Sequence, residues 1–502
     1  MRRGEGNSKM DDNASMAPSK SQGSDLPLKA THALSPRGNF IHVDGDAKHR
    51  PSALGDGDNT SLCHLCHQLG LSVDKFVIPD DVPTSAYNSN KSMRPDSDTN
   101  TPGLVNSVMR SGGPPLKLGS LWDIQHRQHH CVLCNLLAQS VEQRDLNKAL
   151  KEHSQELLEL AQCELSWEID GREYLDTTTG LIKNRTRRLR VQWSHPALQQ
   201  FGSYLVFVAP EQDWRPNSEA QASSRREIHF LGRSIAPHKG RTALIKSWLD
   251  LCRYHHNEHC QDKYEGTEEF EKMLGESYFG LLDVVNMQLC VLPHGRNVNG
   301  FAYEPFVALS YVWGKPEAGK PEPYVTLREN ILLHQNHGGL QGAYPDFPKA
   351  IKEAIDLVPR LGMRYIWIDS LCIVQDSFRS WNLNARRMHM IYGFASLTIC
   401  AADGEDSSTG LEAMYADSAD QIQGHCAPGV TLMVSRPPET AIRGSRWNQR
   451  AWTFQERLLS RRCVIFAEKR VYFQCRSASM SQDIYAHGRG TAWSLNSIHA
   501  PL

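Results

Sequence analysis

The sequence predicts a protein of the α/β class, with a doubly wound and mainly parallel sheet in residues 306 to 402. Segments typical of short buried strands alternate there with segments typical of amphipathic helices. A strand, a covering helix and a second strand form a βαβ unit, whose strands are normally parallel with a right-handed crossover. We expect a mixed α+β region in residues 141 to 300. Residues 1 to 60 are rich in Ser, Gly, Asp and Lys without an apolar period, and we expect them to be disordered.

The first strand and the first helix of the α/β part follow from simple patterns. Phe306 to Tyr311 is an apolar run that indicates a buried strand. Asp346 is suited to cap a helix that begins at Phe347-Pro348. The apolar stripe of this helix consists of Ile351, Ala354, Ile355 and Val358. Pro359 is expected to end or bend the helix, and Gly362 completes the turn into the next strand.

A second strand, Tyr365 to Ile368, leads into a polar corner that begins with Asp369. A helix follows, and its apolar face consists of Trp381, Ala385, Met388 and Tyr392. Ser396 to Ala402 is typical of a third buried strand. In open α/β sheets ligands bind beyond the carboxyl ends of the strands, where Asp369 is expected to lie. The alternative is that Asp369 only caps or turns the chain as it leaves the strand.

After residue 403 the pattern is less regular. Residues 447 to 459 predict a helix, whose apolar face consists of Trp447, Ala451, Phe454 and Leu458. Cys463 to Phe466 and Val471 to Phe473 predict a β-hairpin. We therefore expect a C-terminal hairpin and tail in residues 457 to 502.

Two Cys-x-x-Cys pairs lie in residues 61 to 140, which we expect to form a separate region. The pairs are Cys63 with Cys66, and Cys131 with Cys134. Two such pairs can hold one zinc ion in a tetrahedron of thiolates. The chain between them, with an insert at about 76 to 117 that is expected to be disordered, would then loop out. The alternative is that the four cysteines are buried free thiols.

A second candidate metal site lies in or near a predicted helix at residues 245 to 260. The candidate ligands are Cys252, His255, His259 and Cys260. Positions 252, 255 and 259 share a helical face. The alternative is that the two histidines are ordinary polar residues near the end of the helix.

Composition and charge exclude some functions. The chain of 502 residues has a formal net charge of −1 and a pI of about 7.1. This balance gives no field that would attract nucleic acid or an anionic membrane. No apolar run reaches the roughly 18 residues of a membrane-spanning helix. The 13 cysteines, without an apolar signal segment at the start, favour reduced thiols and a cytoplasmic location.

Three motifs between residues 306 and 456 together resemble the fungal heterokaryon incompatibility (HET) domain. They are Ala308 to Gly314 (ALSYVWG), Trp367 to Asp376 (WIDSLCIVQD) and Arg450 to Glu456 (RAWTFQE). The resemblance implies a protein of non-self recognition in filamentous fungi. It also implies that the domain is the effector that triggers programmed cell death.

HET domains are thought to be similar to TIR domains, and the resemblance therefore implies a TIR-like fold. Catalytic TIR domains cleave the nicotinamide–ribose bond of NAD with a glutamate on a helix. By this resemblance, the residues that would contact the nucleotide are Ser310, Tyr311, Trp313, Gly314, Asp369, Arg450 and Trp452.

The chain departs from the family pattern at the expected glutamate, because Asn384 stands in its place. An amide cannot act as a general base or carry the charge that stabilises an oxocarbenium ion. Asp369 or Glu456 would then have to supply the carboxylate. The alternative for Glu456 is an ion pair on the helix surface with Arg457 or Arg461.

Three functions follow, in order of preference. The first is a HET protein of incompatibility and cell death, whose domain acts as an assembly or signalling module through protein partners or self-association. The second is a TIR-like hydrolase that consumes NAD. The third is a zinc-dependent nucleic-acid binder, which the absence of a basic patch argues against.

Overall fold

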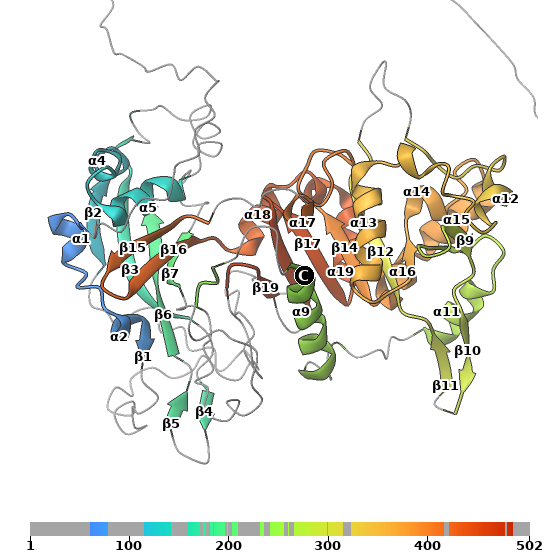
Figure 1. Cartoon of the computed structure of the whole chain (residues 1–502), viewed down its shortest axis with the longest axis horizontal. Coiled ribbons are helices and arrows are strands. Elements are labelled where there is room, and N and C mark those ends of the chain that lie inside the picture. The colour runs from blue at the N-terminus through green and yellow to red at the C-terminus, as the bar shows by residue number, and fades with distance from the viewer. Residues whose placement is uncertain are drawn as a thin grey trace, which may run out of the picture. The chain divides into compact units, whose positions relative to one another are not determined.

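We describe the chain from a computed structural model (Figure 1). The described residues are 61–78, 115–141, 156, 159–170, 174–176, 181–183, 185–195, 198, 203–208, 231–234, 241–255, 260, 266–298, 300–314, 323–415, 421–476 and 479–484. The segments expected to be disordered, residues 1 to 60 and most of 76 to 117, lie outside the described residues. No helix among the described residues has the length and apolar content needed to cross a membrane.

An eight-stranded sheet contains the strands predicted between residues 306 and 402. In spatial order its strands are β19 (Ser479–Ser481), β18 (Arg470–Cys475), β17 (Arg462–Ala467), β14 (Leu397–Ala401), β12 (Phe306–Ser310), β13 (Tyr365–Trp367), β8 (Leu281–Asp283) and β9 (Gln288–Cys290). The pairs β13–β12, β12–β14 and β14–β17 are parallel. The chain thus steps from β12 to β13 on one side and then to β14 and β17 on the other, so that the strand order reverses at β12.

A mixed α and β architecture is confirmed, and the three strands predicted between residues 306 and 402 pair in parallel, but the sheet as a whole is not mainly parallel. In the eight-stranded sheet, parallel pairing is confined to the central strands, and β8, β9, β18 and β19 pair antiparallel. Short connections explain the antiparallel pairs β8–β9, β17–β18 and β18–β19, because parallel neighbours need a long crossover. Between β17 and β18 the connection is Glu468-Lys469, and both residues have positive φ angles of 50° and 57°. Such angles are those of the tight hairpin turns that match the twist of the strands.

Several helices connect the strands of this sheet. They are α12 (Ile331–His334), η3 (Tyr344–Asp346), α13 (Lys349–Arg360), α14 (Asp369–Cys372), α15 (Phe378–Arg386), α16 (Met388–Phe394), α17 (Glu412–Tyr415), α18 (Pro438–Gly444), η4 (Trp447–Gln449) and α19 (Ala451–Leu459). Before β12 lie α9 (Arg241–His255), α11 (Thr267–Leu274) and the hairpin of β10 (His294–Asn297) and β11 (Gly300–Tyr303).

The single helix predicted from Trp381 to Tyr392 is wrong, because the structure has two helices there. Arg387, with φ −113° and ψ 14°, leaves the helical conformation and separates α15 from α16. The break interrupts the helical repeat, so that one continuous apolar stripe does not run through both helices. Tyr392 in α16 is buried, whereas Trp381 in α15 is 48% exposed.

Helix α13 buries the stripe that its sequence predicts. Ile351, Ala354, Ile355 and Val358 are all buried in the main core. The apolar stripe predicted for residues 447 to 459 is not buried in this way. Only Trp447 of that stripe, in η4, is buried, while Ala451, Phe454 and Leu458 of α19 are exposed.

A seven-stranded sheet lies outside the parallel core. Its strands are β15 (Gln423–Ala427), β16 (Val430–Ser435), β7 (Ser203–Phe207), β6 (Arg185–Trp193), β3 (Gln162–Asp170) and β2 (Leu116–Ser120), with β1 (Val77–Ile78) paired to β6. All of its pairings are antiparallel. Strands β15 and β16 come from a point in the sequence between β14 and β17, and β16 pairs with β7 (Figure 1). The remaining elements of this region are α1 (His64–His67), α2 (Val73–Phe76), α4 (Leu121–Arg127), α5 (Val132–Ser140) and the small hairpin of β4 (Tyr174–Asp176) and β5 (Leu181–Lys183).

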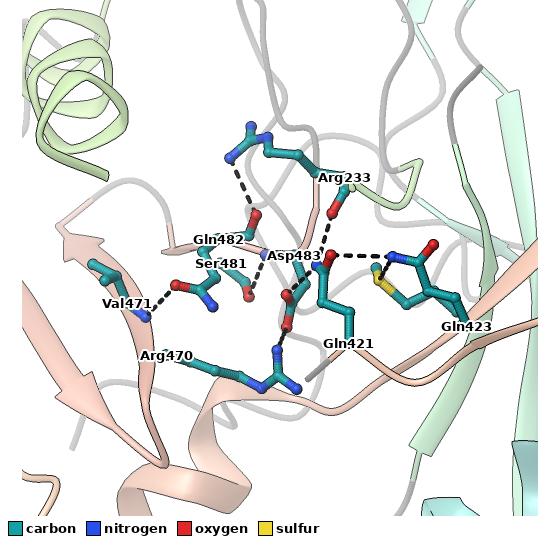
Figure 2. Close-up of polar contacts among 9 residues, drawn as sticks. Arg233, Gln421, Gln423, Arg470, Val471, Ser481, Gln482 and Asp483 are labelled. Carbon is teal, nitrogen blue, oxygen red and sulfur yellow. Dashed lines mark hydrogen bonds and ion pairs between the residues drawn. The ribbon is translucent and has the colours of Figure 1, made fainter. Parts of the chain in front are cut away.

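A buried polar network ties β18 and β19 to the segment that enters β15 (Figure 2). Asp483 accepts a hydrogen bond from Gln421 Nε2 at 2.7 Å and forms an ion pair with Arg470 at 2.6 Å. Gln421 Nε2 also donates to the backbone carbonyl of Arg233 at 2.8 Å. Because Asp483 is only 4% exposed, these partners replace the water that its charge loses on burial.

Candidate functional site

A cluster of polar side chains lies at the carboxyl ends of the parallel strands β12 and β13. Ser310 is the last residue of β12, and its hydroxyl donates to the Glu456 carboxylate of α19. The same hydroxyl accepts a hydrogen bond from Trp447 Nε1 at 2.7 Å. Ser310 is 1% exposed and Glu456 is 7% exposed. This contact therefore joins β12 to the helix that precedes β17 inside the protein.

Asp369 forms the second half of the cluster, just beyond the end of β13. Its carboxylate accepts hydrogen bonds from Trp313 Nε1 and from the backbone amide of Ser370, both at 2.7 Å. The Tyr311 hydroxyl lies close enough to bond the same carboxyl. Asp369 is therefore both the first residue of a short helix and a member of the cluster.

Arg450 supplies positive charge near both carboxyl groups. Its Nη1 donates to the backbone carbonyl of Tyr311 at 3.2 Å. Its charge acts to lower the pKa of Asp369 and that of Glu456. The cluster thus contains the carboxyl groups of Asp369 and Glu456 and the guanidinium of Arg450, which lies at the start of α19.

Burial outweighs the attraction of Arg450 for both acids. Loss of solvent raises the pKa of Glu456 to about 7, against the hydrogen bond from Ser310, and the negative charge of Asp369 raises it further. Burial likewise raises the pKa of Asp369, although Trp313 and the Ser370 amide oppose this shift. With a pKa of about 7, Glu456 can hold a proton at neutral pH, as a general acid must.

Glu456 does not form the surface ion pair that we weighed against a functional role. Arg457 instead pairs with Glu439 at 2.5 Å, and Arg461 Nη2 donates to the Phe394 carbonyl at 2.7 Å. Tyr392, from α16, also lies within hydrogen-bond reach of Glu456 and donates to the Leu309 carbonyl at 3.1 Å. No pattern in the sequence marked Tyr392 or Trp447 as members of the cluster, because both look like ordinary core aromatics.

Asn384 has no contact with this cluster. It is fully buried in α15, where its Nδ2 donates to the Ser380 carbonyl at 2.9 Å and to the Tyr278 carbonyl at 3.2 Å. No hydrogen bond joins it to Ser310, Asp369 or Glu456 in the described part of the chain. The expectation that Asn384 shares one crevice with Ser310 and Asp369 therefore finds no contact to support it.

Two further residues expected at the nucleotide have different surroundings. Gly314 has a φ of +96°, and a Cβ there would meet Asp406 at 2.9 Å, so that glycine is required by the backbone itself. Trp452 is 52% exposed and lies on the outward side of α19. A hollow beside the cluster is lined by Tyr311, Trp313 and Ser370, and its walls leave no room for a water molecule.

The four cysteines of the two Cys-x-x-Cys pairs come together. The Sγ atoms of Cys63, Cys66, Cys131 and Cys134 lie within 4.8 Å of one another. Cys134 Sγ is 3.9 Å from Cys63 Sγ and 3.7 Å from Cys66 Sγ. Four Zn–S bonds of about 2.3 Å in a tetrahedron give sulfur separations of roughly 3.8 Å. The set can therefore hold a metal ion.

Local structure favours a thiolate at one of these cysteines, Cys131. Cys131 caps α5 and accepts from the Cys134 amide at 3.4 Å, as a thiolate at the start of a helix can. Hydrogen bonds from Cys134 and Cys66 lower the pKa of Cys131. The expected loop between the two pairs is largely outside the described residues.

Comparison with known proteins found a family match in the part of the chain that contains the polar cluster of Ser310, Asp369 and Glu456. No curated protein and no solved structure matches the chain. Residues 306–456 match the family model of the heterokaryon incompatibility protein (HET). This segment begins at β12 and ends at Glu456, and thus includes Ser310, Asp369 and Arg450. Residues 306–456 of this chain are therefore similar to the HET family.

Proposed function

We propose that the chain is a fungal protein of non-self recognition, whose HET domain triggers cell death by binding another protein. The orientation of α15 and α19 is the observation that carries this proposal. Both helices turn polar residues inward and aromatic residues outward. Ser377, Ser380 and Asn384 are buried at α15, and Thr453, Glu456 and Ser460 are buried at α19.

The outward sides of these helices expose large apolar groups. Phe378 is 77% exposed and Trp381 is 48% exposed on α15, while Trp452 is 52% exposed and Leu458 is 53% exposed on α19. Helix α16 packs against both α15 and α19 and adds the half-buried Met388 and Met390. Exposed apolar groups gathered on neighbouring helices are typical of sites that bind other proteins, and aromatic residues often dominate such binding.

Charge indicates which kind of partner fits this surface. Arg379 and Arg386 are exposed on α15, and residues 377 to 394 contain no acidic side chain. In α19 the only acidic residue is Glu456, which is buried. A second copy of the same surface would bring arginines against arginines. A partner with an apolar face and acidic side chains around it complements the surface better.

The inner cluster supports the same reading. Ser310, Glu456, Asp369 and Trp313 find their hydrogen-bond partners in one another, and the adjoining hollow has no room for a ligand. A closed set of mutually satisfied polar groups fixes the position of α19 against β12. The polar cluster thus holds α19 in the position from which its exposed apolar side can bind a partner.

The test is a cell-death assay in a filamentous fungus that expresses the full chain. The double variant Trp381→Asp with Trp452→Asp is expected to lose cell death at unchanged protein level, because aspartates repel an acidic partner and remove the aromatic contacts. Leu332→Asp, at a 74% exposed leucine of α12, is the matched control and is expected to act like wild type. Full cell death with the double variant would contradict the proposal.

A second candidate function is a TIR-like hydrolase of NAD. The parallel order β13–β12–β14–β17 and two acids at the ends of β12 and β13 favour it, since ligands of such sheets bind where the strand order reverses. Glu456, with a pKa of about 7, would be the acid, and the hollow at Tyr311 would have to open. Release of nicotinamide by the full chain, abolished by Glu456→Gln, would establish this function in place of the first.

We also infer that Cys63, Cys66, Cys131 and Cys134 hold a structural zinc ion. The short sulfur separations and the Cys131 cap support zinc over four free thiols, because reduced thiols gain little from such close contact. Zinc would join α1 to α5 across the long intervening chain. Purified chain is expected to contain zinc that Cys66→Ser removes, and a metal-free wild-type chain would refute this inference.

A further inference from the structure

A second group of thiols lies beside strand β18 of the eight-stranded sheet. The Sγ atoms of Cys252 in α9, of Cys260 and of Cys475 in β18 lie within 4.8 Å of one another. Cys252 and Cys260 are each 1% exposed, and Cys475 is 9% exposed. The sequence had indicated Cys252 and Cys260 as ligands together with His255 and His259. Cys475 was missed because it is more than 200 residues away in sequence, and His259 lies outside the described residues.

A buried arginine indicates that this group of thiols carries negative charge. Arg462 is 5% exposed, and its Nε donates to Cys252 Sγ at 3.1 Å. Its other hydrogen bonds go to the carbonyls of Cys260, at 2.8 Å, and Ser396, at 3.4 Å. None of these acceptors is a carboxylate. A buried guanidinium keeps its proton, and it is costly unless an anion lies beside it.

We propose that Cys252, Cys260 and Cys475 bind a zinc ion as three thiolates. Zinc prefers thiolate ligands in a tetrahedron, and three thiolates leave one position for a further donor. Each thiol gives up its proton to solvent as its Zn–S bond forms, and no electron is transferred. Three thiolates and one zinc ion have a net charge of −1, which the charge of Arg462 balances. The proposal thus explains both the meeting of the thiols and the buried arginine.

The position of this site gives it a structural consequence. Helix α9 precedes the HET match, and β18 follows it, so that the metal ion would link two segments on either side of residues 306–456. Arg462, the first residue of β17, is also held by the site. Zinc would therefore fix the edge of the sheet that follows the buried Glu456. The site shares no residue with the cysteines of the α1–α5 region, and each can be lost without the other.

The experiment is a measurement of zinc per chain in the full-length protein and in three single variants. Wild type is expected to hold two zinc ions per chain. Cys475→Ser and Cys66→Ser are each expected to hold one, from the opposite sites. Cys290→Ser changes a half-buried cysteine outside both groups and is the matched control, with two ions expected. If wild type holds one ion that only Cys66→Ser removes, the second site does not exist.

A further measurement on wild type covers the case in which Cys475→Ser fails to fold. The chain is treated with a chelator and then alkylated in mild denaturant, and the labelled cysteines are mapped by mass spectrometry. Chelation is expected to increase the labelling of Cys252, Cys260 and Cys475 at least severalfold. Equal labelling with and without chelator, or a disulfide between two of these residues, would overturn the proposal. Cys475→His, which keeps a metal ligand, is expected to restore the second zinc ion.

Discussion

Helix α13 and helix α19 connect strands of the same sheet, but they use their two sides in opposite ways. Helix α13 buries Ile351, Ile355 and Val358 together with one acid, Glu353, and leaves its other polar side chains half-buried or exposed. Helix α19 buries Thr453 and Glu456 and leaves Trp452, Phe454 and Leu458 exposed. The difference teaches that hydrophobic periodicity defines an apolar face but not the direction in which that face points. An ordinary core surrounds α13, whereas α19 lies over the polar ends of the strands.

The largest expected difference between the two helices is in their contribution to stability. Ile355→Ala in α13 is expected to lower the free energy of unfolding by about 3 kcal/mol, because it leaves a cavity in the main core. Leu458→Ala in α19 removes the same number of carbon atoms from an exposed position and is expected to cost less than about 0.5 kcal/mol. Urea denaturation of both variants measures this difference. Equal losses would show that α19 buries its apolar face in solution.

The buried acid of α19 predicts a pH dependence of stability, to which Glu353, the buried acid of α13 whose pKa burial also raises, contributes as well. Folding raises the pKa of Glu456 from 4.5 to about 7, and the protonated form is therefore favoured in the folded state. Its contribution to stability is complete below about pH 4.5 and is lost as the pH rises through about 7. On the order of 3 to 4 kcal/mol is at stake, since one pKa unit corresponds to about 1.4 kcal/mol.

Glu456→Gln isolates this contribution, because the amide is uncharged at every pH. Urea denaturation at pH 5, 6, 7 and 8 is expected to show a wild-type loss of stability that the variant lacks. Asp369 also has a raised pKa, so part of the dependence is expected to persist in the variant. Identical pH profiles of the two proteins would contradict the burial of Glu456.

A smaller effect is expected from the inward hydroxyl of Thr453. Its Oγ1 donates to the carbonyls of Trp447 and Arg450, the latter at 2.9 Å. Thr453→Val keeps the shape but removes the donor, and is expected to cost about 1 to 2 kcal/mol because buried acceptors lose their partner. If α19 were an ordinary amphipathic helix, the same change would raise stability. Thermal unfolding of the variant distinguishes these outcomes.

The sequence predicted the strands of the parallel core well, since each is a continuous apolar run. Phe306–Ser310, Tyr365–Trp367 and Leu397–Ala401 all lie within the predicted segments. Long apolar runs can be buried only between layers, so their place in the fold follows from composition. The antiparallel edges were harder to predict from the sequence, because β8 and β9 are three-residue strands whose pairing is set by the tertiary structure.

The candidate sites were predictable only in part. The two Cys-x-x-Cys pairs were recognised because ligand spacing is local, whereas Cys475 reaches its partners through the fold. Ser310, Asp369 and Arg450 were found through motifs at strand and helix ends. The burial of Glu456 was not predicted, because in a helix with the sequence AWTFQERLL the aromatic residues are expected to be buried and the glutamate exposed. Only the position of Ser310 and Trp447 beneath the helix explains why the carboxyl group lies inside.

We propose that the outward face of α19 binds the partner protein, whereas its buried face only holds the helix against the sheet. The most direct test compares cell death caused by the full chain with Trp452→Asp and with Glu456→Gln, at matched protein level in the same fungal host. We predict that Trp452→Asp reduces cell death at least tenfold. We predict that Glu456→Gln causes as much cell death as wild type at the growth pH. Cell death that persists with Trp452→Asp but disappears with folded Glu456→Gln would contradict this proposal.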